Sequence, residues 1–247
     1  APLIGKLTLT VVPLAGSLLY IAHRFSWANM AVVGVIATYG THALGYGAFV
    51  ATGFVQSDFL SGQSVLVIYW LLFEGFDLLG IWRRRELPAA ARAIFPLNAC
   101  GFVGISLLHW PLFARETLHL FLAAAGAAYL VSTLLRARLK PPSSFPQAAD
   151  IAQRMAKGGY EGAVTLAVAL ITPGILLRFS GLDANLALML EGEFLLLAGL
   201  RLGQPYLRFL AAIVFVFPLF KLGLFDLLKG EFVAVAGTSL KAWTPVA

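Results

Sequence analysis

The sequence is poor in cysteine and in charged residues, and each shortage excludes a class of protein. Its single cysteine, Cys100, cannot form a disulfide within the chain. Charged residues make up 12% of the 247 residues and hydrophobic residues 60%, whereas soluble domains average about 25% charged and about 45–50% apolar residues. The composition therefore predicts an integral membrane protein and not a soluble domain.

Motifs of common catalytic and nucleotide-binding sites are also missing. The sequence contains no Gly-rich phosphate loop, no Cys/His cluster with metal-ligand spacing and no Ser/His/Asp constellation near an expected helix end. We therefore expect no enzymatic activity, no metal and no cofactor. Lipid is the expected bound molecule.

Eight long apolar runs predict an all-α fold, a polytopic bundle of transmembrane helices. A helix needs about 20 mainly apolar residues to cross about 30 Å of hydrocarbon. The runs are continuous and do not alternate in polarity, which disfavours the roughly ten-residue strands of an outer-membrane barrel. The predicted spans are roughly 7–22, 30–53, 63–82, 93–112, 117–136, 159–178, 185–203 and 207–227.

The 18 Lys and Arg residues are divided unevenly between the two ends of these spans. If the spans alternate in direction, twelve basic residues fall on one side, including the cluster Arg83, Arg84 and Arg85. Cytoplasmic loops carry the excess of Lys and Arg, so both termini are expected on the non-cytoplasmic side. The same rule accounts for the net charge of +6 without a nucleic-acid partner. An outward N-terminus so close to the first span indicates a preceding segment, either a cleaved signal peptide or a further helix.

A polar interruption near the middle divides the chain. Residues 139–158 contain Pro-Pro-Ser-Ser-Phe-Pro, which stops helix continuation, and then a basic amphipathic stretch. We predict a cytoplasmic linker with a short surface helix there. Residues 1–138 would form a first membrane repeat plus the fifth span, and 159–230 the remaining spans of a second repeat. The tail, 231–247, is too short and interrupted to span, and is expected along the outer interface.

Two short matches indicate the internal repeat. The segment EGFDLLGIW from Glu74 corresponds to EFLLLAGLR from Glu193, 119 positions later. The segment FPLNACG from Phe95 corresponds to FPLFKLG from Phe217, 122 positions later. Both matches shift the chain by four spans, which preserves orientation across the membrane. They predict a parallel tandem repeat of four helices.

Acids inside the predicted spans are candidate functional residues, because a charge at the bilayer centre costs about 2.5–3.5 kcal/mol on insertion scales. Glu74 and Glu193 lie near the centres of spans three and seven. Asp77 follows Glu74 by three positions and shares its helix face. One interpretation is a proton or cation relay. The other is structural: a protonated Glu74 is hydrogen-bonded across a helix interface, and Asp77 reaches the Arg83–Arg85 cluster or interfacial water.

Glu191 and Lys221 are expected to form an ion pair between the last two spans. At 1.5 Å per residue, Glu191 lies about 4–5 Å and Lys221 about 6 Å to the outer side of their span centres. Pairing would remove most of the insertion penalty of both residues. The alternative is a Lys221 that extends alone toward the outer interface. Asp226 falls at the outer boundary, where water solvates it.

Two intramembrane histidines raise the question of a haem or another pigment. Two axial ligands must lie at one level, whereas His42 and His109 differ by roughly six residues, or about 9 Å, in expected depth. A shared site is therefore not expected. Ligation of a pigment by one histidine stays open, and a buried histidine bonded to a neighbouring helix is the simpler interpretation.

The last third of the chain resembles a known family. The stretch LLLAGLRLGQPYLRFLAAIVFVFPLFKLGLFDL, Leu195 to Leu227, is similar to the predicted bacterial multi-span membrane proteins called DUF2339. Members repeat a helix that ends in Gly-Leu-Arg, a short basic turn, and a helix that ends in a Lys-x-x-x-x-Asp pattern like that of Lys221 to Asp226. The resemblance implies a bacterial cytoplasmic (inner) membrane protein, and brings no established activity.

Two functions fit these observations. One is a non-catalytic structural or accessory subunit that contacts lipid and other membrane subunits, in which the buried charges are paired. The other is a transporter or a proton or ion conduit that uses Glu74 and Glu193 at equivalent positions of the repeat. The first is the one we favour, because each span has few polar groups.

Overall fold

The computed structural model describes residues 2–25, 27–50, 56–83, 92–139, 159–221, 232–235 and 238–241. These residues contain eight α-helices, in the predicted order. A short 3-10 helix, Arg115–Thr117, precedes the fifth. The helices are α1 (Pro2–Phe25), α2 (Ala28–Val50), α3 (Gln56–Trp82), α4 (Ile94–Phe113), α5 (Leu118–Leu139), α7 (Tyr160–Arg178), α8 (Gly181–Arg201) and α9 (Pro205–Lys221).

Four of the helices are long and apolar enough to cross a membrane. They comprise Phe59–Trp82, Ile94–Phe113, Arg115–Leu139 and Tyr160–Arg178. Of the others, α8 carries three acids and α9 has 17 residues, slightly fewer than a span of about 20 residues requires. The helical fold is therefore confirmed, whereas eight spans stay a prediction.

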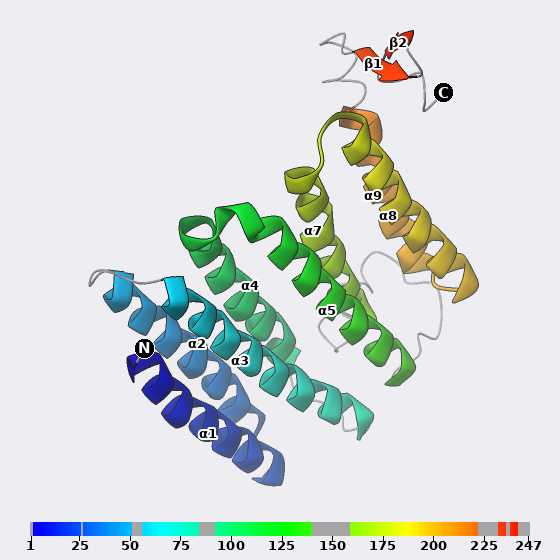
Figure 1. Ribbon diagram of the computed structural model, residues 1–247. Coiled ribbons are helices and arrows are strands. Elements are labelled where there is room, and N and C mark those ends of the chain that lie inside the picture. Colours follow the sequence, from blue (N-terminus) through cyan, green and yellow to red (C-terminus); the bar gives the residue numbers. More distant parts are fainter. Residues whose placement is uncertain are drawn as a thin grey trace. The chain divides into compact units, whose positions relative to one another are not determined.

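The chain divides into two units, each with its own core. The first unit consists of α1–α4 and the end of α5 from Leu135. Within it, α1 packs on α2 and α3, and α4 packs on the same two helices (Figure 1). Gly101 of α4 lies against Tyr39 of α2, since a Cβ atom added to Gly101 would be 2.5 Å from the tyrosine ring. A glycine thus permits the close approach of α4 to α2.

The second unit contains the rest of α5, with α7, α8 and α9. Helices α8 and α9 form an antiparallel hairpin, and α7 packs on both (Figure 1). Gly203, in the turn between α8 and α9, has a φ of 65°, a left-handed conformation that glycine adopts without steric cost. Gly192 packs against the ring of Phe215, where an added Cβ would be 2.9 Å away. This contact fixes the register of the hairpin.

The described part of the tail is a small antiparallel hairpin, which was not predicted. Strand β1 (Phe232–Val235) pairs with β2 (Thr238–Lys241), with Phe232 opposite Lys241. The predicted linker, residues 139–158, lies outside the described residues apart from Leu139.

The helix contacts agree in part with the predicted repeat. Helix α3 packs on α4 as α8 packs on α9, and α2 packs on α4 as α7 packs on α9. The two predicted counterparts differ in burial, however. Glu74 is 4% exposed, whereas Glu193 lies on the exposed face of α8. The repeat therefore stays a prediction.

Candidate functional site

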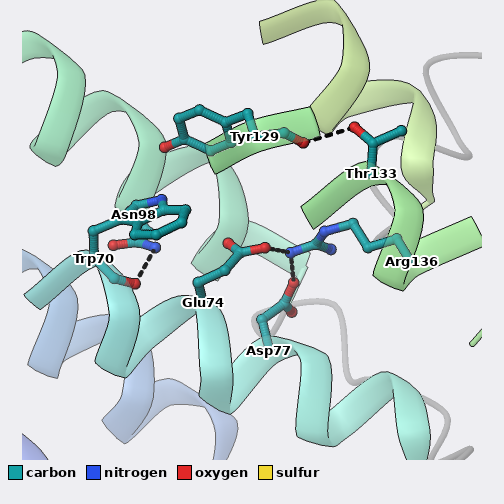
Figure 2. A network of polar contacts seen from close by, with 7 residues as sticks. All are labelled: Trp70, Glu74, Asp77, Asn98, Tyr129, Thr133 and Arg136. Carbon is teal, nitrogen blue, oxygen red and sulfur yellow. Dashed lines mark hydrogen bonds and ion pairs between the residues drawn. The ribbon is translucent and has the colours of Figure 1, made fainter. Parts of the chain in front are cut away.

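A buried arginine holds two buried acids together in the first unit (Figure 2). Nη2 of Arg136 lies 2.6 Å from Oε1 of Glu74 and 2.7 Å from Oδ2 of Asp77. The arginine side chain is 0% exposed and the acids are at most 5% exposed. A charge excluded from water is stable only beside an opposite charge with further polar contacts. We call these three residues the Arg136 triad.

Helical periodicity explains how the triad forms. Glu74 and Asp77 are three positions apart on α3, so both side chains leave the same face of the helix. Helix α5 carries a second polar face, because positions 129, 132, 133 and 136 follow the spacing of one helix stripe. All four are buried, and the Thr133 hydroxyl donates to the Tyr129 carbonyl 2.8 Å away, as Figure 2 shows.

The aromatic ring of Phe95 completes the surroundings of the guanidinium. The Cζ atom of Arg136 lies 4.4 Å from the centre of this α4 ring. A guanidinium over a ring face at this distance gains about 0.5–2 kcal/mol from the ring quadrupole. The end of α5 is thereby held by α3 and α4 together. With both acids ionised, the triad carries one negative charge in excess.

The cation that holds the two acids was not predicted. Asp77 was expected to reach Arg83, Arg84 and Arg85 or interfacial water, and its carboxylate contacts Arg136 on the face that it shares with Glu74. Arg83 lies beyond the end of the helix, and its Nη1 is 2.6 Å from Nε2 of His23 in α1. Arg84 and Arg85 are outside the described residues.

Further polar contacts continue along the interface of α3 and α4. The Asn98 amide donates to the Trp70 carbonyl, 3.2 Å away (Figure 2), and accepts a hydrogen bond of 2.7 Å from the Tyr39 hydroxyl. Ser106 donates to the side-chain oxygen of Gln63, 2.9 Å away. These hydrogen bonds lie inside the first unit, as is typical of polar groups within a tightly packed membrane bundle.

The predicted ion pair between Glu191 and Lys221 is not formed. Thr172 of α7 donates to Glu191, with its hydroxyl 3.1 and 3.0 Å from the two carboxyl oxygens. Lys221 donates to the carbonyl of Gly181, 3.1 Å away. The error is one of register: α8 begins at Gly181, so Glu191 is its midpoint, whereas Lys221 ends α9 and lies beside the start of α8. The ten residues between Gly181 and Glu191 correspond to about 15 Å.

Glu193 lies on the outer face of α8. It is exposed in the second unit, as are Leu190, Phe194 and Leu197 on the same helix, at 64 to 65%. An acid in an otherwise apolar face needs a polar neighbour when that face is in hydrocarbon. Asp226, the acid predicted at the outer boundary, is outside the described residues.

The two histidines lie in the first unit. His42 is buried and packs edge-on against the Tyr69 ring, with centroids 5.9 Å apart. His109 of α4 is half-buried. In the described part of the chain, no group of three or more His, Cys, Asp or Glu residues is arranged to hold a metal ion.

Arg136 is the residue that sequence reasoning missed. It was counted among the basic residues that set topology, because it stands three positions before the predicted linker. The signal that would have found it is the polar stripe of α5, with Tyr129, Ser132, Thr133 and Arg136 on one face. Glu161, 2% exposed in the first turn of α7, was also missed, because it precedes the apolar run directly.

Comparisons with known proteins add no family to this picture. Protein-family models, curated proteins and solved structures were each searched with the chain, and none matches. The geometry of the described residues is thus the basis for a functional proposal.

Proposed function

We propose that this chain is a non-catalytic structural or accessory subunit of a larger membrane assembly. The observation that carries the proposal is the Arg136 triad. Its charged groups are paired with one another and are nearly inaccessible to solvent, which is the arrangement of a structural contact between helices. A conduit would need the same acids to exchange protons with water.

The outer surfaces of the helices support contact with lipid and with other subunits. Many large apolar side chains are exposed, among them Leu44 at 80% and Leu108 at 70%. Exposed apolar surface of this kind is stable in a bilayer or against another protein. Glu193, within such a surface on α8, supports a protein neighbour that supplies a polar group.

The bacterial cytoplasmic membrane, with both termini on the non-cytoplasmic side, is the location that we propose. It is supported by the distribution of Lys and Arg and by the resemblance of the last third to DUF2339. Both supports come from the sequence.

Reconstitution tests the proposal against the alternative of a proton or ion conduit through Glu74 and Glu193. Liposomes with the purified chain and a trapped pH-sensitive dye are given a membrane potential. We expect the internal pH to change as slowly as in protein-free liposomes, because the triad is closed to water. A proton flux that Glu74→Gln abolishes, and that Glu116→Gln at an exposed site does not, contradicts the structural role.

In mild detergent, the tagged chain should also purify from its native membrane with other subunits at constant stoichiometry.

A further inference from the structure

We propose that Glu191 is a proton-binding residue of the second unit, neutral in the membrane and hydrogen-bonded to Thr172. The inference does not depend on the structural role proposed above. It concerns a different acid from the two that the sequence suggested for a conduit.

Glu191 lies within the packed helices of the second unit. It is the midpoint of α8 and is half-buried against α7, close to the fully buried Leu188 and Leu195. Thr172, 5% exposed, faces both carboxyl oxygens at 3.0–3.1 Å. One hydroxyl has one proton to donate, so it cannot satisfy both oxygens of a carboxylate.

Other ionisable groups lie on all three helices. On α7 they are Tyr160, Glu161 and Arg178, at its two ends. On α9 they are Tyr206 and Arg208 near the start and Lys221 at the end. On α8 itself they are Asp183, Glu193 and Arg201. Among the described residues, none of these cations forms an ion pair with Glu191.

Glu191 differs in its partner from the acids of the first unit. Glu74 and Asp77 contact the cation Arg136, whereas Glu191 contacts a neutral donor. An isolated carboxylate in an apolar environment takes up a proton, because burial penalises the charged form. The threonine hydroxyl can donate to either form of the acid and can also accept. It therefore remains a partner when the proton arrives or leaves.

Infrared spectroscopy of the full chain in lipid tests this assignment. A film of the reconstituted protein is perfused at neutral and then at alkaline pH, and the difference spectrum reports the C=O stretch of neutral carboxylic acids. We expect a band that is lost at alkaline pH, is absent from Glu191→Gln and persists in Glu193→Gln. Thr172→Val should retain the band at higher frequency, because the hydrogen bond to the carbonyl oxygen is removed.

Two results would overturn the inference. One is a spectrum of Glu191→Gln that keeps every acid band of the unmodified chain. The other is a band whose frequency is unchanged in Thr172→Val. Glutamine imitates the neutral acid, so Glu191→Gln should unfold at the same temperature as the unmodified chain. If it unfolds earlier by several degrees, Glu191 carries a charge that the fold uses, and the assignment is likewise wrong.

Discussion

Substitution of Arg136 by methionine is expected to lower the free energy of unfolding by about 3–5 kcal/mol, the usual effect of removing one partner from a buried ion pair. Methionine fills much of the same volume, so the loss arises from charge and not from a cavity. Glu74 and Asp77 would lose the guanidinium that contacts both of them. The stacking of the guanidinium on Phe95 would be lost as well. Unfolding by SDS in mixed micelles measures the change.

Arg138→Met is the matched control. Arg138 stands two positions further along α5 and is exposed, so its removal should change the free energy of unfolding by less than about 0.5 kcal/mol. Equal effects of the two substitutions would mean that α5 needs basic residues at its end for topology alone. In that case the triad has no special role in stability.

The double substitution Glu74→Gln with Asp77→Asn is expected to lower the free energy of unfolding by about 3–5 kcal/mol. This is as large an effect as the loss of the arginine. Both new side chains keep an oxygen that accepts a hydrogen bond, and both have nearly the volume of the acids. What disappears is the negative charge of both acids that contact the buried guanidinium. The same unfolding measurement applies, with circular dichroism to confirm that helix content is retained before unfolding.

The two single substitutions are the controls for this pair. After Glu74→Gln, Asp77 still neutralises Arg136 at 2.7 Å, and after Asp77→Asn, Glu74 does so at 2.6 Å. Each single change should therefore cost at most about 1.5 kcal/mol, the loss of part of a charge-assisted hydrogen bond. If one single substitution equals the double, that acid alone carries the interaction.

The helices themselves were predictable from the sequence. Continuous apolar runs of span length leave few alternatives to a helix in a bilayer, and all eight expected helices are present in the described residues. Their ends were less predictable. Gln56 to Gly62 extend α3 beyond the predicted span because polar residues such as Gln56, Ser57 and Asp58 are compatible with a helix that continues into water.

Tertiary partners could not be predicted from depth alone. The predicted span 185–203 is centred on residue 194 and α8 on residue 191. This difference of about 4.5 Å led to a false pairing of Glu191 with Lys221. Arg136 was missed for a different reason. A basic residue near a helix end satisfies the positive-inside rule and equally a buried acid on a neighbouring helix, and only the packing of α5 on α3 distinguishes these roles.

The central claim, that the Arg136 triad is a structural contact, is tested most directly by replacing all of it. The variant with Glu74→Leu, Asp77→Val and Arg136→Met removes every charge and keeps the interior filled with apolar atoms. Well-packed hydrophobic replacements of buried ion networks are often neutral or stabilising by about 1–4 kcal/mol. We expect the triple variant to unfold at an SDS mole fraction equal to or higher than the one at which the unmodified chain unfolds. It should thereby recover the stability lost in Arg136→Met. A triple variant that is as unstable as Arg136→Met would contradict the claim.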